Sequence, residues 1–163
     1  MRDKYPLRYL PKKLTKKDKK KQIKELKKSR NMYKKKKYHT RKHVKSFKTK
    51  KSAHLIKAEK MYDIKSIRPN NELAKKTGCS VNALKKIVKK GQGAYYSSGS
   101  RPNQSGHSWG YARLASAITS GKAAAVDYNI LESGCHKRSR ALKLAKKAKT
   151  KHGYGTRKVP KTK

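Results

Sequence analysis

Apolar side chains recur three and four positions apart over most of the chain, which is the spacing of amphipathic helices. Glycine, proline and capping residues divide this pattern into helices expected near residues 15–37, 52–62, 72–77, 81–90, 108–120 and 136–151, with a short turn over 127–131. The sequence therefore predicts a mainly α fold. A small helical domain with a helix-turn-helix-like hairpin is flanked by long basic arms, helical or extended.

The first predicted helix is a cationic rod with one narrow apolar stripe. Thr15 and Asp18 have the spacing of a capping box, and the stripe consists of Ile23, Leu26, Arg30 and Tyr33. Lysines three and four positions apart repel one another on a helix, so we expect this helix to depend on a bound polyanion. Ser52 is expected to cap the second helix, whose apolar side carries Leu55, Ala58, Met61 and Tyr62.

The hairpin is the most informative stretch of the sequence. Asn70 or Asn71 can cap its first helix, Gly78 suits the tight turn, Ser80 can cap its second helix, and Gly91 is expected to end that helix. The predicted core of the domain comprises Leu73, Ala74, Gly78, Leu84, Ile87, Tyr95, Tyr96, Trp109, Leu114 and Ile118. The same hairpin serves as simple packing in many proteins, so its spacing does not by itself indicate DNA recognition.

Residues 92–107 are rich in Gly, Ser, Asn and Pro and predict a long ordered loop. Tyr95 and Tyr96 in this loop are either a stacking platform for bases or packing between helices, and we favour packing. Gly121 is expected to end the following helix, Asp127 to cap the short turn, and Gly134 to close it.

Four segments follow from these patterns: an extended Pro/Tyr strap at 1–14, a basic arm with two helices at 15–68, the helical domain at 69–135, and a basic C-terminal helix and tail at 136–163. The strap is either anchored by its apolar side chains or a disordered end. Residues 38–51 show no period and are interpreted as a basic linker. The last residues, from Gly153, are expected to be disordered without a partner.

The charge is very uneven along the chain. The 163 residues carry 49 Lys and Arg against 8 Asp and Glu, a formal charge of +41. Residues 1–68 hold 28 basic and 5 acidic side chains, and residues 136–163 hold 12 basic and none acidic. Residues 91–135, by contrast, are close to neutral. Such arms favour nucleic acid as partner, with an anionic membrane surface or an acidic protein surface second.

The candidate contacts to nucleic acid or another polyanion are basic side chains of the arms and of the second hairpin helix. They are Lys12, Lys13, Lys16, Lys17, Lys20, Lys24, Lys27, Lys28, Lys34, Lys35, Arg41, Lys42, Lys85, Lys86, Lys89, Lys137, Arg138 and Arg140. If the second hairpin helix entered a major groove, only Asn82 could form two hydrogen bonds to the edge of one base. The sequence therefore favours docking on the phosphate backbone over recognition of bases.

Motifs for catalysis or metal binding are weak. Ser97, Ser98, His107, Ser108 and Asp127 supply the residue types of a nucleophile triad without its characteristic turn. His39 and His43, or Cys135 with His136, lack a second pair that would complete a zinc site. We expect no enzyme activity, cofactor, metal or small-molecule substrate. No apolar run is long enough to span a bilayer, and no secretory signal is visible, so we expect a cytosolic or nuclear protein. In that setting Cys79 and Cys135 are interpreted as buried thiols, with a disulfide between them as the less favoured alternative.

Gly93-Ala94-Tyr95-Tyr96-Ser97-Ser98-Gly99-Ser100-Arg101-Pro102 and Ser108-Trp109-Gly110-Tyr111-Ala112-Arg113-Leu114 resemble a small domain of large DNA viruses of algae and amoebae, with related forms in tailed phages. The resemblance covers roughly residues 71–135, and the leader from Leu10 to Arg30 is similar to that of the large-virus members. The domain has no established activity, so the resemblance assigns no residue a role. What it implies is an origin in a large icosahedral DNA virus.

The resemblance, taken with the cationic arms, implies a structural virion protein, a minor capsid component on the inner side of the shell. Its expected partners are capsid proteins of the same particle and double-stranded DNA, with an anionic internal membrane surface as a further option. In the host cell it is expected in the virus factory, in cytoplasm or nucleus. The alternatives are a non-specific DNA-binding protein that condenses or regulates the genome, and a ribosomal-type RNA-binding protein.

Overall fold

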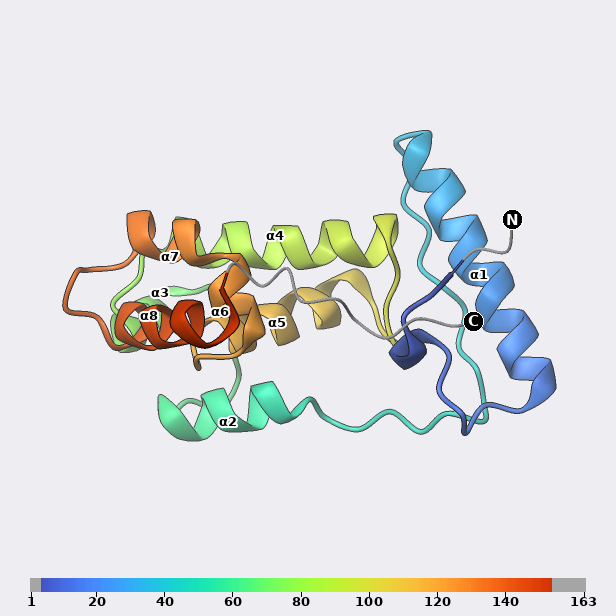
Figure 1. Cartoon of the computed structure of the whole chain (residues 1–163), viewed down its shortest axis with the longest axis horizontal. Helices are drawn as coiled ribbons and strands as arrows, with labels where there is room; N and C mark the ends of the chain where they lie inside the picture. Colours follow the sequence, from blue (N-terminus) through green and yellow to red (C-terminus); the bar gives the residue numbers. More distant parts are fainter. Residues whose placement is uncertain (1–3, 154–163) are drawn as a thin grey trace. The chain divides into compact units, whose positions relative to one another are not determined.

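The computed structural model describes residues 4–153, which form eight α helices, one short 3-10 helix and no strand (Figure 1). The mainly α prediction is confirmed. The predicted disorder of the C-terminal tail concerns residues 154–163, which lie outside the described residues. The elements are η1 (Leu7–Tyr9), α1 (Lys16–Lys34), α2 (Ala53–Met61), α3 (Asn71–Thr77), α4 (Val81–Ser97), α5 (Gly106–Ala117), α6 (Lys122–Val126), α7 (Tyr128–Gly134) and α8 (Arg140–His152).

The described chain divides into two compact units. Unit 1 contains residues 4–50 and 92–109, and unit 2 contains residues 51–91 and 110–153. Each unit takes part of α4 and part of α5. This division differs from the predicted central domain with separate arms, because residues of both arms are buried within a unit. Leu26 of α1 lies in an apolar cluster of unit 1, and Ala145 of α8 lies in the core of unit 2.

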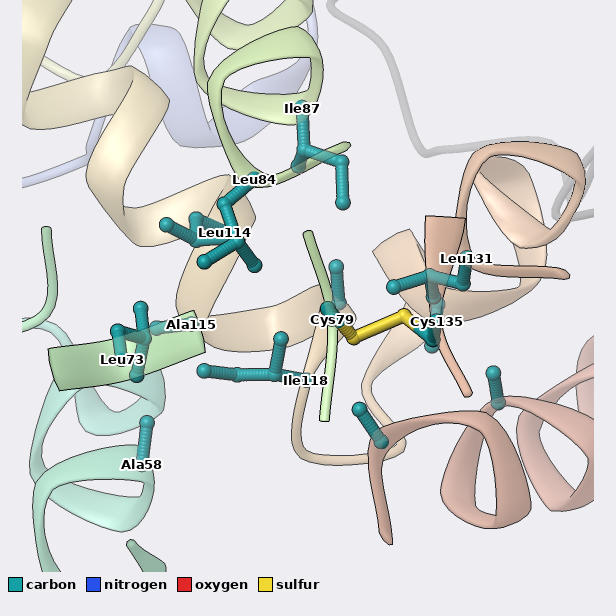
Figure 2. Packing of buried hydrophobic residues seen from close by; sticks show 14 of the residues in the cluster. Ala58, Leu73, Cys79, Leu84, Ile87, Leu114, Ala115, Ile118, Leu131 and Cys135 are labelled. Atoms are coloured by element: carbon teal, nitrogen blue, oxygen red, sulfur yellow. A yellow bond between two sulfur atoms is a disulfide. The ribbon is translucent and has the colours of Figure 1, made fainter. Parts of the chain in front are cut away.

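Unit 2 has the larger hydrophobic core, and Figure 2 shows part of it around the predicted hairpin. The predicted core residues Leu73, Leu84, Ile87, Leu114 and Ile118 are all buried there, with Ala74 packed against them. Helices α6, α7 and α8 pack against one another beside this cluster. The apolar spacing of α2 is also confirmed, since Ala58 and Tyr62 are buried in the same core.

The hairpin of α3 and α4 forms as its capping residues predict. The side chain of Asn70 accepts a hydrogen bond from the Leu73 N–H at 3.0 Å, and that of Ser80 accepts one from the Ala83 N–H at 3.1 Å. Gly78 between them has φ 74°, a left-handed conformation that side chains disfavour. A Cβ at Gly78 would also lie 2.6 Å from the Cβ of Ser139, so this glycine is required for space as well.

The prediction of two buried thiols is wrong: Cys79 and Cys135 form a disulfide (Figure 2). The two residues face each other across a short antiparallel bridge. The Ser80 N–H donates to the Gly134 carbonyl and the His136 N–H donates to the Gly78 carbonyl, each at 2.7 Å. The bond closes a sequence separation of 56 residues, which corresponds to about 4 kcal/mol in the chain-entropy model. The hairpin turn is therefore clamped to the segment that leads into α8.

Helix α4 continues six residues beyond the predicted stop at Gly91. The reason is tertiary: a Cβ on Gly91 would lie 2.6 Å from the Cα of Gly110 in α5. Gly91 thus allows two helix backbones to approach closely instead of ending a helix. The predicted loop at 92–107 is correspondingly short, and irregular structure covers only residues 98–105.

The region after α5 differs from the prediction in two ways. Residues 122–126 form α6, a helix that was not predicted, and its Ala124 and Ala125 are buried in the core of unit 2. Asp127 precedes α7 but makes no side-chain capping hydrogen bond, since its carboxylate binds cations elsewhere in unit 2. Gly134 ends α7 as expected.

In unit 1 the N-terminal strap is anchored, and part of it is the 3-10 helix η1 instead of an extended chain. Tyr5, Tyr9, Leu10 and Leu26 form a buried cluster, against which Ile23 and Trp109 pack. The ring of Tyr9 meets that of Trp109 edge-on at a centroid distance of 6.4 Å. Thr15 caps α1 as predicted, whereas the Asp18 carboxylate accepts from the Ser46 N–H at 2.8 Å, so the capping box is only half formed.

A pair of glycine substitutions within α4 tests the close helix contact. We expect Gly91→Ala to lower the free energy of unfolding by about 1–3 kcal/mol, because its methyl group would overlap the backbone at Gly110. Gly93→Ala is the matched control, since beyond its chain neighbours and the backbone of its own helix no atom lies within 4 Å of a Cβ there. It should raise stability by about 0.5–1 kcal/mol through helix propensity. Urea unfolding measures both, and equal effects of the two variants would contradict the packing role of Gly91.

Candidate functional site

Of the predicted polyanion contacts, all but Arg41 are exposed. On and around α1 these are Lys12, Lys13, Lys16, Lys17, Lys20, Lys24, Lys27, Lys28, Lys34, Lys35 and Lys42. In unit 2 they are Lys85, Lys86, Lys89, Lys137, Arg138 and Arg140. Arg140 is also held in place, since its guanidinium donates to the Met61 carbonyl at 2.8 Å and lies over the Tyr62 ring. We refer to these exposed side chains as the cationic surface of their unit.

Asp18 and Glu25, the acidic side chains of unit 1, are hydrogen-bonded within the fold and offset only a small part of its cationic surface. Glu25 is buried, lies 2.7 Å from the His39 ring nitrogen, and accepts from the Lys42 N–H at 2.9 Å. Burial opposes its ionisation, but these hydrogen bonds and the nearby His39 outweigh it, so the pKa of Glu25 is lowered. Hydrogen bonds from Ser46 likewise lower the pKa of Asp18.

In unit 2 the carboxylate of Asp127 is fully buried and bound by two cations. Arg113 donates to both of its oxygens at 2.8 Å, and the Lys90 ammonium lies 3.3 Å from Oδ1. Two-point binding of this kind fixes α5 to the start of α7. Asp127 therefore supports the fold, which explains why it caps no helix and is not available as a member of a catalytic triad.

Arg41 is the exception among the predicted contacts, because it is buried at the centre of unit 1. Its guanidinium donates to Ser29 Oγ at 2.9 Å, to the Tyr95 carbonyl at 2.6 Å and to Ser100 Oγ at 2.7 Å. It also lies 3.7 Å from the centroid of the Tyr95 ring. Burial lowers the pKa of Arg41, while the neighbouring Tyr95 opposes that shift. The residue that seemed part of a basic linker thus cross-links three segments.

The second hairpin helix, α4, presents one polar face. Asn82, Lys85, Lys86 and Lys89 follow the i, i+3, i+4, i+7 spacing and are exposed, whereas Leu84 and Ile87 on the other side are buried. Three ammonium groups on this face can neutralise phosphates. Only Asn82 among them has the amide geometry suited to a base edge.

Tyr95 packs inside unit 1 and is not exposed for stacking with a base, which agrees with the interpretation favoured from the sequence. It is fully buried, and its hydroxyl accepts from the Arg41 N–H at 3.0 Å. Burial raises its pKa. Tyr96 is half-buried and meets Tyr95 edge-on at 4.9 Å. A second tyrosine neighbour was not foreseen: Tyr38, in the supposed linker, has its ring centroid 5.1 Å from that of Tyr96 and remains 70% exposed.

A depression of about 310 Å³ lies in unit 1 between α1 and the end of α4. It is lined by Lys27, Arg30, Asn31, Lys34, Ser97 and Ser98. The four α1 residues have the spacing of one helix face, which was visible in the sequence. From the sequence, Ser97 and Ser98 are only candidate members of a nucleophile triad. Their position beside this face could not be read from spacing, because a long stretch of chain separates them from α1.

The remaining residues considered for a nucleophile triad or a zinc site make other contacts. Ser108 Oγ donates to the Gln104 side chain at 2.8 Å, and the His107 ring nitrogen lies 2.9 Å from Gln92 Nε2. His39 binds Glu25, and Cys135 is in the disulfide. Within residues 4–153, no group of three or more His, Cys, Asp or Glu could hold a metal ion, and no helix is long and apolar enough to cross a bilayer.

Comparison with known proteins identifies the family but assigns no activity. Residues 6–131 match the model of the family of unknown function DUF5824, and the chain belongs to that family. No curated protein and no solved structure matches the chain. The function must therefore be inferred from the surface and the contacts described above.

The buried position of Arg41 can be tested against its exposed neighbour Lys42. Arg41→Lys retains the charge but cannot reach three acceptors and cover the Tyr95 ring, so we expect a loss of about 2–3 kcal/mol in the free energy of unfolding. Lys42→Gln should change stability by less than about 0.5 kcal/mol. Urea unfolding followed by tyrosine fluorescence reports both values, and similar values for the two variants would contradict the buried role of Arg41.

Proposed function

For this member of a family without an assigned function, we propose that the chain is a structural protein that binds nucleic acid through the phosphate backbone without reading the sequence. The observation that carries the proposal is that several of the few carboxylates are already bound by other groups of the protein. Of only eight acidic side chains, Asp18, Glu25 and Asp127 are hydrogen-bonded or paired inside the fold, and Glu59 pairs with Lys51 at the surface. The exposed lysines therefore face solvent with few nearby counter-charges, which favours a polyanionic partner.

The division of labour between arginine and lysine supports backbone binding over base reading. Arginine is the side chain best suited to two-point recognition of guanine. Here Arg30, Arg41, Arg113 and Arg140 donate hydrogen bonds within the protein, and Arg8 and Arg68 lie over aromatic rings. The solvent-facing cations are mainly lysines, which act on phosphates as mobile point charges.

A minor capsid component on the inner side of a virus shell is the second candidate. It is supported by the resemblance of residues 93–102 and 108–114 to a domain of large DNA viruses. In this setting the cationic surfaces would contact neighbouring capsid proteins, the packaged double-stranded DNA, or both, and the protein would be found in the virion and the virus factory. The buried networks and the disulfide would support the fold, and no catalytic step is proposed.

Titration of the purified full chain onto duplex DNA at several salt concentrations tests the leading proposal. We expect log K to fall linearly with log salt with a slope of about −4 or steeper, because several phosphates release counterions. Two duplexes of unrelated sequence should bind within about threefold of each other. Replacing Lys85, Lys86 and Lys89 by Gln should make the slope shallower by about 1 for each phosphate that is no longer neutralised. Absence of binding at moderate salt, or a strong preference for one sequence, would contradict the proposal.

The location of the chain in a virus particle separates the two candidates. Particles opened gently and fractionated should release the chain with the DNA if backbone binding is its main role. A capsid component should stay with the emptied shells. Quantitative immunoblotting of both fractions gives the answer, and a chain absent from purified particles would contradict both virion roles.

A further inference from the structure

We propose that unit 1 carries a site for an unpaired nucleotide, in which a base stacks on Tyr38 and its phosphate lies in the depression between α1 and the end of α4. This inference rests on the proposed function and narrows it, because it names single-stranded nucleic acid as a ligand of one defined site. It combines the exposed ring of Tyr38, which follows α1 in the chain, with a cationic depression between α1 and the end of α4. Two neighbours of Tyr38 in the aromatic row, Tyr33 and Tyr96, lie on these two helices.

The stacking half of the site is an aromatic row that ends in solvent. Tyr95 is buried, Tyr96 packs edge-on against it, and Tyr38 packs on Tyr96 with ring centroids 5.1 Å apart. Tyr33 of α1 follows at 6.2 Å from Tyr38. Tyr38 is 70% exposed, the largest exposed fraction among the exposed large apolar side chains of the described chain. A tyrosine ring held this way offers a base a surface for stacking.

The aromatic row is positioned by buried contacts of Arg41 and Ser29. Arg41 lies over the Tyr95 ring and donates to the Tyr95 carbonyl, which fixes the first member of the row. Ser29 of α1 donates to the Tyr96 carbonyl at 3.1 Å, which ties the second member to the helix that carries Tyr33. The platform is therefore preorganised by contacts that leave the Tyr38 ring largely exposed.

The phosphate half of the site is the depression of Lys27, Arg30, Asn31, Lys34, Ser97 and Ser98. Arg30 is oriented by its Nε–H, which donates to the Ser98 carbonyl at 2.8 Å, and by the Tyr5 ring 4.4 Å away. Its guanidinium carries four further N–H groups. Ammonium, amide and hydroxyl donors around an oriented guanidinium match the acceptor oxygens of a phosphate.

The two halves adjoin along both segments. Tyr33 lies one turn after Arg30 on α1 and directly precedes Lys34, and Tyr96 directly precedes Ser97 on α4. Neither carboxylate of unit 1 lines the depression, since Glu25 accepts from the Lys42 N–H and Asp18 from the Ser46 N–H elsewhere in the unit. A nucleotide that bridges the halves must be unpaired, since bases in a duplex already stack on their neighbours.

Tyrosine substitutions test the stacking half. We expect Tyr38→Ala to weaken binding of a single-stranded thymidine oligonucleotide by about tenfold, with duplex binding unchanged. Tyr38→Phe keeps the ring and should bind like the parent chain. An abasic oligonucleotide of the same length carries the phosphates without the bases, so its affinity should be equal for all three proteins. Equal losses for the thymidine and abasic oligonucleotides in Tyr38→Ala would overturn the proposal.

Two pairs of lysines test the phosphate half. Lys27→Gln with Lys34→Gln should weaken single-strand binding about tenfold and abolish the shift of the Arg30 Nε–H NMR resonance on addition of inorganic phosphate. Lys17→Gln with Lys24→Gln removes the same charge at the same spacing on α1 and so reports the diffuse contribution of the cationic surface. It should weaken single-strand binding by much less than the first pair and leave the phosphate-induced shift of the Arg30 resonance intact. Equal effects of the two pairs would show diffuse charge and overturn the site.

The outcomes also separate this inference from the proposed function. Steep, salt-dependent duplex binding with no effect of Tyr38→Ala on single strands would overturn the site and leave the proposed function standing. Tyr38-dependent binding of single strands without duplex binding would support the site and contradict the duplex role. A phosphate shift at Arg30 without any oligonucleotide binding would assign the depression to a free anion and overturn the nucleotide site.

Discussion

Repulsion among 49 basic side chains, with 8 acidic ones to oppose it, is the constraint that every other feature of this structure must satisfy. The fold meets it by using part of its own cations as cross-links. Arg41 joins three segments of unit 1, and Arg113 with Lys90 binds the buried Asp127 in unit 2. Arginine serves this purpose because its planar group can donate several hydrogen bonds and cover a ring at once. The disulfide adds a covalent clamp at the hairpin turn.

What these cross-links leave outside is mainly lysine. The ammonium groups of α1 and of the outer face of α4 are exposed, and the few carboxylates nearby are occupied internally. A surface of this composition favours phosphate and carries little information about sequence. The proposed single-strand site adds selectivity of another kind, since an exposed ring on a rigid aromatic row distinguishes an unpaired base from a duplex.

Several elements could be predicted because their signals are local. Caps at Thr15, Ser52, Asn70 and Ser80 fix where helices begin, and the side chain of each accepts a backbone hydrogen bond as the sequence indicates. Gly78 takes the left-handed turn that it alone tolerates without strain. Apolar spacing likewise identified Leu73, Leu84 and Ile87 as core, since helical periodicity depends only on neighbours in the chain.

The predictions that failed share a cause, which is that a partner distant in the sequence decided the role of the residue. Gly91 has the local signature of a helix end, but the backbone at Gly110 makes it a contact point inside a helix. Cys79 and Cys135 are 56 positions apart in the sequence, and they lie close together only because the fold pairs their two segments in a short antiparallel bridge.

Composition and periodicity by themselves determined a mainly helical, strongly cationic protein and most of its helix starts. Tertiary structure decided which cations are buried and which face solvent, because burial requires acceptors that only folding brings together, as Tyr95 and Ser100 are brought to Arg41.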